Sequence, residues 1–487
     1  DPALLDEAAA AVAGEEDRVH GGFGGAPKFP PSNLLEGLLR GHERTGSPET
    51  LRLVERTAEA MARGGIHDQL GGGFARYSVD SGWVVPHFEK MLYDNALLLR
   101  AYAHLARITD APVPRRVTEG IVAFLLRDLR TDEGCFASAL DADTDGVEGL
   151  TYVWTPQQLV DVLGDADGAW AADLFAVTDT GTFEEGTSVL QLPADPADQA
   201  RSDSVRVRLL AARQYRSQPG RDDKVVTAWN GFAVTGLVEA GVALGRPDWI
   251  DAAATCARAL LGLHLVDGRL RRASLGGAVG APVGVLEDHG ALITALLALY
   301  QATGDARWLE PARELADIAL TYFADPDRPG SWFDTAHDSP ELVARPRDPV
   351  DGATPSGASL ITEAMLSLAA VVDDGARYAE MAHASLDDAS LLLDRAPRSA
   401  GHWLTVAEAA VRGPIQVVVV GGGELLEVAR RVAPGGSLVV GGEPGSSPLL
   451  VDRPLVDGAS AAYVCRGFVC DRPVTSVPAL REALAAR

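Results

Sequence analysis

A helix pair that repeats along the chain constrains its fold more than any other feature. Apolar residues recur at helical spacing in successive pairs of segments. Before each pair stands a glycine-containing turn with an aromatic or apolar residue, and each pair opens on a polar cluster. Successive clusters lie about 60 to 70 residues apart, with one step about twice as long, as expected for stacked helical hairpins. The turns centre on Phe23, Phe74, Phe136, Leu270 and Trp332, and the clusters on Asn33, Asn95, Asn230, His289 and Ser359.

The hairpins predict a closed ring. A sixth hairpin forms if the first helical segment, 2–13, pairs with the last, 402–412. We therefore predict a mainly α fold, an (α/α)6 toroid in which one helix of each pair lines the axis. The polar clusters lie at the N-terminal ends of the axial helices, so they meet at one mouth. Helix N-termini carry partial positive charge, which suits oxygen-rich ligands.

Two segments depart from the repeat. The long step holds a mixed region at about 134–220, which we interpret as an insertion. After residue 412 the pattern changes to a β-type run at Ile415–Val420, two shorter strands and two helices. We predict a toroid over 1–412 with this insertion, followed by a small C-terminal α/β domain over 413–487.

Composition excludes some classes of protein. The 487 residues carry a net charge of −25, and such an acidic surface repels nucleic acid. No apolar run is long enough to span a membrane, and the first residues lack the pattern of a secretion signal. Four cysteines are too few for a disulfide scaffold, so we expect a cytoplasmic protein with Cys465 and Cys470 reduced.

The stretch 64–96 is densest in side chains that do chemistry. We expect a helix from Pro86 to about 108, which would place His87, Lys90 and Asp94 on one face. Glu89 would lie beside them. A histidine whose pKa is near neutral is a natural general base for moving a proton next to a carbonyl, so His87 is the first candidate base.

Three functional readings stay open at this point. In the first, His87 and His289, beside Asp288, are the paired bases of a sugar epimerase or isomerase. In the second, two carboxylates form the acid and base of a glycoside hydrolase. In the third, the toroid binds a ligand or a redox partner without turnover. The candidate catalytic residues are His87, Glu89, Asp94, His289 and Asp288.

The candidate substrate-binding residues are polar or aromatic side chains of the predicted mouth. Aromatic rings among acids and amides are typical of sugar sites, since sugars stack their C–H faces on rings. The residues are Asp68, Arg76, Tyr77, Trp83, Lys90, Tyr93, Asn95, Asp141, Asp143, Asp223, Lys224, Trp229, Asn230, Glu287, Asp351 and Ser356.

No cofactor is expected from the sequence. Asp141, Asp143 and Asp145 match the opening of a calcium loop, but the twelfth position is Tyr152 and not the glutamate that such loops need. Ca²⁺ at these residues is the minor alternative to an acidic loop at the mouth. No histidine and cysteine set has zinc spacing.

Several long motifs carry a family resemblance. They include GGFGGAPKFP at 21–30, GGIHDQLGGGFARYSVD at 64–80, VPHFEKMLYDNA at 85–96 and YVCRGFVCDRPV at 463–474. With these motifs the chain resembles the spermatogenesis-associated protein 20-like family over nearly its whole length. The resemblance implies a toroid like that of six-hairpin glycosidases and N-acylglucosamine 2-epimerases. It also implies a thioredoxin-like domain or protein as a partner, because members of the family carry such a domain ahead of the toroid.

Overall fold

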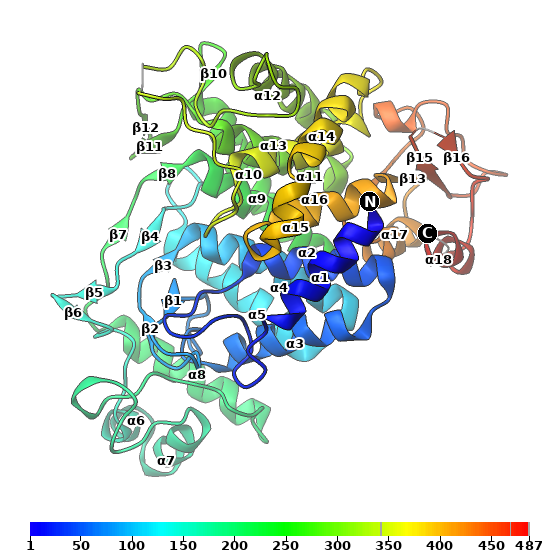
Figure 1. The fold of residues 1–487 in the computed structure, drawn as a ribbon. Coiled ribbons are helices and arrows are strands. Elements are labelled where there is room, and N and C mark those ends of the chain that lie inside the picture. The colour runs from blue at the N-terminus through cyan, green and yellow to red at the C-terminus, as the bar shows by residue number, and fades with distance from the viewer. Residues whose placement is uncertain (341–342, 468, 486–487) are drawn as a thin grey trace.

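A ring of helix hairpins forms most of the computed structural model, which describes residues 1–340, 343–467 and 469–485 (Figure 1). Each axial helix packs against the next one around the ring, and the last packs against the first. The prediction of an (α/α)6 toroid is confirmed. In ring order the axial helices are α2 (Ser32–Thr45), α4 (Leu92–Thr109), α9 (Thr227–Leu244), α11 (Leu286–Thr303), α13 (Gly357–Ala369) and α16 (Gly401–Arg412).

An outer helix covers each axial one. The helix α1 (Pro2–Gly14) lies against α2 and α16, so the first and last helices close the ring as predicted. The other outer helices are α3 (Pro48–Arg63), α5 (Pro112–Phe124), α10 (Pro247–His264), α12 (Leu309–Tyr322) and α14 (Ala376–Asp388).

Small residues let the axial helices approach closely. A Cβ added to Gly290 of α11 would lie 2.7 Å from the backbone nitrogen of Ile361 on α13. One added to Gly231 of α9 would lie 2.8 Å from the carbonyl carbon of Ala291 on α11. The axial helices α9 and α11 are apolar around most of their circumference, which is the pattern of a helix buried on all sides.

The sequence repeat has a physical basis at two of its junctions. Asn95, in the first turn of α4, accepts from the Phe74 N–H at 2.7 Å and donates to the Phe74 carbonyl at 3.0 Å. Asn230, in the first turn of α9, makes the same pair of bonds with Phe136 at 2.8 and 3.0 Å. Each asparagine therefore ties a glycine-aromatic turn to the helix that follows it.

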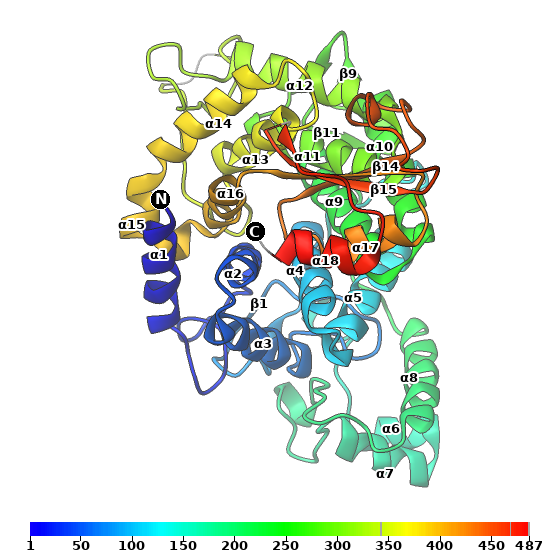
Figure 2. The ribbon, with the colours of Figure 1, turned by 90° about the vertical axis from the view of Figure 1, so that its right-hand side faces the viewer.

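The insertion contributes β4 (Ala139–Leu140), β5 (Asp143–Thr144), β6 (Val147–Glu148) and a helical lobe of α6 (Pro156–Leu163), α7 (Asp165–Leu174) and α8 (Gln199–Gln214). The lobe projects from the ring (Figure 2) and has its own apolar core around Trp154 and Phe175. The helix α6 begins after Thr155, and Thr155 and Gln158 form a capping box.

The C-terminal segment forms a small sheet at the end of the ring opposite to the mouth strands (Figure 1). Its strand order is β14 (Leu438–Gly442), β13 (Ile415–Val420), β15 (Ala461–Arg466) and β16 (Val469–Cys470). Alternate residues of β13 face opposite sides. Val418 and Val420 join the toroid core, whereas Val417 and Val419 pack under α17 (Glu424–Val432) and α18 (Val477–Ala485). The exact division into domains stays a prediction.

The expectation of reduced cysteines is wrong for one pair. Because β15 and β16 are antiparallel, Cys465 lies opposite Cys470, and the two form a disulfide. The guanidinium of Arg453 lies 3.4 Å from the Cys470 sulfur. Cys135 and Cys256 are free and buried. None of the helices in the described part of the chain is long and apolar enough to cross a bilayer.

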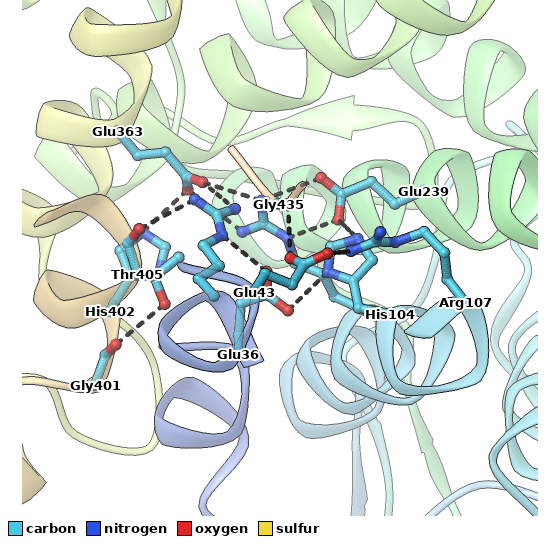
Figure 3. Close-up of polar contacts among 12 residues, drawn as sticks. Glu36, Glu43, His104, Arg107, Glu239, Glu363, Gly401, His402, Thr405 and Gly435 are labelled. Carbon is cyan, nitrogen blue, oxygen red and sulfur yellow. Dashed lines mark hydrogen bonds and ion pairs between the residues drawn. The ribbon is translucent and has the colours of Figure 1, made fainter. Parts of the chain in front are cut away.

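A buried ion network spans the axis of the ring (Figure 3). Arg40 binds Glu36 at 3.0 Å and Glu363 at 3.2 Å, and Arg100 binds Glu363 at 3.0 Å. Arg100 also binds Glu239 at 2.7 Å. These bonds link α2, α4, α9 and α13.

His104 completes this network. It lies 2.7 Å from Glu36 and 3.1 Å from Glu239. Burial alone lowers the pKa of His104, but the carboxylates of Glu36 and Glu239 outweigh it and raise the pKa to about 9. Protonated His104 then gives the network as many positive as negative charges.

We predict that His104 makes stability depend on pH on the alkaline side. Its folded pKa is above its unfolded value, so its contribution is complete below about pH 6.5 and is lost as the pH rises through about 9. Between these limits the loss is up to about 1.4 kcal/mol per pH unit. Urea unfolding between pH 6 and 10 measures it, with His104→Gln expected to lose the slope.

His383→Gln is the matched control, because His383 is an exposed residue of the outer helix α14. Equal slopes for the wild type and His104→Gln would contradict the assignment.

Candidate functional site

The segment before α4 is extended, and the predicted helix from Pro86 is wrong. The helix begins at Leu92, and Pro86–His87 forms β2, which pairs with β1 (Tyr77–Ser78) so that His87 lies opposite Tyr77. Successive side chains of an extended segment point to opposite sides. His87 and Glu89 are therefore partly exposed on one side, while Phe88 and Lys90 are buried on the other. The helical face of His87, Lys90 and Asp94 does not exist.

His87 is held in a defined orientation. Its Nδ1 lies 2.9 Å from Glu148 Oε1, and its ring stacks on Tyr77 with centroids 5.0 Å apart. Its Nε2 lies 3.8 Å from Glu89 Oε2, which is beyond hydrogen-bond distance. When Nδ1 carries the proton that Glu148 accepts, Nε2 keeps a lone pair. Glu148 comes from the β5–β6 hairpin of the insertion.

Arg76 connects Glu89 to the first turn of α4. Its Nη1 donates to Glu89 Oε2 at 3.0 Å, and its guanidinium also contacts the phenol of Tyr93. Burial and the nearby Asp94 raise the pKa of Tyr93 to about 12, so this phenol keeps its proton. The Tyr93 ring meets the Trp229 ring edge to face at 5.0 Å.

Asp94 is a buried acid. Its Oδ2 finds no hydrogen-bond partner among the residues that the structure describes. Burial raises the pKa of Asp94 well above its ordinary value, and the charge of Arg76 only partly opposes the shift, to which Glu89 adds. Burial therefore favours the protonated form of Asp94, beside the ion pair of Arg76 and Glu89.

A second cluster lies on the other side of the first turn of α9. Asp288 accepts from the Ala228 N–H at 2.9 Å, from the Val285 N–H at 2.8 Å and from Arg272 at 2.7 Å. Burial raises the pKa of Asp288 to about 7, against the opposing charge of Arg272. Glu287 binds the same guanidinium at 3.0 Å.

His289 lies behind this second cluster. It is 2% exposed, its Nδ1 bonds the Val285 carbonyl at 3.0 Å, and its ring packs on Phe323. Burial lowers the pKa of His289 to about 4, so the ring is neutral. Its contacts are those of a core histidine, and the structure does not set it opposite His87 as a second exposed base.

Several predicted binding residues have structural partners instead. Asp68 forms a buried ion cluster with Lys90 at 2.7 Å and Arg213 at 2.8 Å. Trp83 is buried and donates to the His20 carbonyl. These side chains, like Asn95 and Asn230, form ion pairs or hydrogen bonds that hold parts of the fold together.

Asp351 and Ser356 cap axial helices. Ser356 caps α13 through the Ser359 N–H. Asp351 accepts from the Ser356 N–H and the Ser359 hydroxyl, and also from the His402 N–H in the first turn of α16. Asp351 thereby joins the starts of two neighbouring axial helices.

The acidic loop folds as a tight hairpin. Asp143 pairs with Glu148 across β5 and β6, and the turn between them has positive φ at Asp145 and Gly146. Within the described ranges no group of three or more His, Cys, Asp or Glu side chains could hold a metal ion. Asp141, Asp143 and Asp145 therefore do not form a set of metal ligands in the described part of the chain.

The remaining predicted residues are surface groups near β7 (Arg221–Asp222). Asp223 pairs with Arg221 at 2.5 Å, and Lys224 pairs with Asp222 at 3.1 Å. Glu148 and Arg272, which contact candidate acids and bases, were missed by sequence reasoning. Glu148 begins the stretch EGLTYVW at 148–154, which was the available signal in the sequence. Arg272 had none.

Curated relatives match almost the entire chain. Spermatogenesis-associated protein 20 from Homo sapiens is 30% identical over 96% of this chain and 67% of its own length. An uncharacterised protein of Caenorhabditis elegans is 30% identical over 95% of this chain and 70% of its own length. The chain belongs to the spermatogenesis-associated protein 20 family. No family model matches it.

Solved structures show what the family's toroid resembles. D-mannose isomerase aligns with a TM-score of 0.52 at 12% identity, over 79% of this chain and 84% of its own. An unsaturated glucuronyl hydrolase specific for heparin aligns with a TM-score of 0.50 at 13% identity, over 85% and 98%. At such identities the likeness shows the fold, which carbohydrate-active enzymes of different reaction types share.

We predict that Asp94 makes the fold less stable as the pH rises. Its folded pKa is above the unfolded one, so stability falls from about pH 4 towards the folded pKa, by up to about 1.4 kcal/mol per pH unit. Asp94→Asn lacks this penalty, so its stability relative to the wild type should increase between pH 4.5 and 7.5. Urea unfolding at several pH values measures the difference.

Asp143→Asn, on the exposed hairpin, serves as the control and should show a constant difference from the wild type. A constant difference for Asp94→Asn as well would show that Asp94 is ionised in the folded protein.

Proposed function

We propose that this protein is a carbohydrate-active enzyme that epimerises or isomerises a sugar or sugar-like substrate by proton transfer at the mouth. One observation carries the proposal: His87, whose imidazole Glu148 orients, and the buried acid Asp94, whose pKa is raised, both lie near the Arg76–Glu89 ion pair. Base and acid in a single cluster are what a proton shift next to a carbonyl requires.

The roles follow from the contacts of each group. His87 Nε2 is the base that takes the proton from the carbon next to the carbonyl of the open-chain sugar. Glu148 holds the ring and stabilises the imidazolium that forms. Asp94, or the protonated Tyr93, donates a hydrogen bond to the carbonyl oxygen, where negative charge develops. Delivery of a proton to the opposite face of the same carbon gives the epimer. Delivery to the neighbouring carbon, with the hydroxyl proton moving to the former carbonyl oxygen, gives the isomer.

Aromatic faces support a sugar as the substrate. Tyr77 stacks between the His87 ring and the Phe29 ring, each at 5.0 Å, and Phe29 is 52% exposed. Trp229 and Tyr93 form a second aromatic pair on the α9 side. Stacking of C–H faces on such rings, with carboxylates and a guanidinium nearby, suits a neutral polyol. A thioredoxin-like partner and a cytoplasmic location stay predictions from the sequence.

Glycoside hydrolysis is the second candidate. Burial raises the pKa of Asp94 and favours its protonated form, whereas the Arg76 guanidinium pairs with Glu89. Two carboxyl groups in different protonation states are the acid and the base that hydrolysis of a glycosidic bond uses. In this reading Arg76 orients Glu89, and His87 does not act as the base.

The test is a screen of mono- and disaccharides in deuterated water, with exchange of the proton at C2 followed by NMR. We expect exchange with at least one sugar, and a loss of about 100-fold or more in His87→Gln, the usual effect of removing a general base. His383→Gln, on an outer helix, should keep the wild-type rate.

The outcomes separate the candidates. Exchange that persists unchanged in His87→Gln removes His87 as the base. Release of reducing ends from disaccharides without C2 exchange, abolished by Asp94→Asn, selects the hydrolase. Absence of both reactions across the panel overturns the proposal of a carbohydrate-active enzyme.

A further inference from the structure

A cavity of about 140 Å³ lies at the end of the ring opposite to the mouth. The C-terminal halves of the axial helices form its walls, and α17 with residues 433–439 covers it. We call it the basal cavity. Its volume is well above the roughly 10–15 Å³ that a single water needs. It is thus large enough for a small organic molecule, and it is distinct from the cluster around His87.

One wall of the basal cavity is aliphatic and the other is cationic. Val238 and Val242 of α9 and Leu297 and Ala298 of α11 form the aliphatic wall. The cationic wall belongs to the axial network and its surroundings. The charged side chains that line the cavity are Arg40, Arg100, His104, Arg107, Arg430, Glu239 and Glu363.

One of the lining cations has no ion-pair partner among the described residues. Glu36 and Glu43 lie just outside the lining and pair with His104 and Arg107 at 2.7 Å each. Arg40 and Arg100 pair with Glu363. Arg430 forms no ion pair within the described part of the chain, although the charge of Glu427 on the same helix acts on it.

Arg430 reaches the cavity from α17. Its Nη2 donates to the carbonyls of Gln301 and Ala302, at 3.2 and 2.6 Å, at the C-terminal end of α11. Its Nε is buried and has no partner among the described residues. A buried donor without a partner costs about 1–3 kcal/mol, so a ligand that supplies an acceptor is favoured there.

Thr294 is a second unpartnered polar group on the same cavity. Its hydroxyl is buried, and it bonds no other residue in the ranges that the structure covers. It stands seven residues before Gln301 on α11, which is about 10 Å along the helix. The two unsatisfied groups therefore mark opposite ends of the cavity, with the aliphatic wall between them.

The loop that covers the cavity lies in close contact with the axial helices. The Gly435 N–H donates to Glu43 Oε2 at 2.7 Å. Gly436 has a φ of +84°, and a Cβ there would lie 2.7 Å from the Ala409 Cβ and 3.2 Å from Arg40 Nη1. Glycine is thus required for this loop to rest on the axial network.

We propose that the basal cavity binds a small linear carboxylic acid with a polar group at its far end. The carboxylate accepts from Arg430 Nε, the hydrocarbon body lies along Val238, Val242 and Leu297, and the far group bonds the Thr294 hydroxyl. The acid gives Arg430 the carboxylate partner that it lacks within the described part of the chain. The proposal does not depend on proton transfer at the mouth.

Three probes with the same six-carbon chain test the proposal: 6-hydroxyhexanoate, hexanoate and 1,6-hexanediol. Calorimetric titration of the full chain should show saturable binding of 6-hydroxyhexanoate, with the diol at least about tenfold weaker, because it loses the charge-assisted bond. Arg430→Gln should weaken binding of both acids about tenfold or more and leave the diol unchanged. Thr294→Val should weaken binding of 6-hydroxyhexanoate and leave hexanoate unchanged.

Two further variants serve as controls. Arg431→Gln, at the exposed neighbour of Arg430 on α17, should bind as the wild type does. Arg430→Lys keeps the charge and should retain part of the affinity, and melting of each variant without ligand confirms folding. No saturable binding of any probe, or equal binding by the wild type and Arg430→Gln, overturns the proposal.

Discussion

The ion network on the axis is the interaction on which the rest of the toroid depends. Glu36, Arg40, Arg100, His104 and Glu363 are buried or nearly so, and they come from three axial helices. Charges in an apolar ring are tolerated only when each one meets an opposite charge in good geometry. The network therefore fixes the rotation of each helix about its own axis. Removal of one partner leaves a buried charge uncompensated, which costs about 3–5 kcal/mol.

The two ends of the ring differ from each other. Extended segments and helix starts surround the mouth, where burial and neighbouring charges give Asp94 and Glu89 different environments. At the other end the C-terminal sheet and the glycines of its connecting loop rest on the axial network. The toroid thus separates the cluster around His87, where we propose proton transfer, from the basal cavity that Arg430 lines. The two ends differ because the axial helices all run in the same direction. Their N-terminal ends therefore surround the mouth, and their C-terminal ends form the opposite end.

Much of the ring could be predicted from the sequence, because its signals are local. The hairpins follow from apolar spacing, and the closure between α1 and α16 follows from counting them. The β-type run of β13 was equally clear. The start of α4 was not, since Pro86 and the residues after it are compatible with a helix, and only the pairing with β1 makes them extended. Disulfide formation between Cys465 and Cys470 likewise depends on strand register.

For the site, the sequence by itself determined which stretch holds the reactive side chains and that His87, Glu89 and Asp94 stand within it. Only the tertiary structure decided their roles. It turned Lys90 away to Asp68, used Asn95 and Asn230 to fix turns, and brought Glu148 from the insertion to His87. The axial network escaped sequence reasoning for the same reason. A charged residue in an apolar helix gives no local sign of whether a partner from another helix will meet it, and burial and pairing are properties of the folded ring alone.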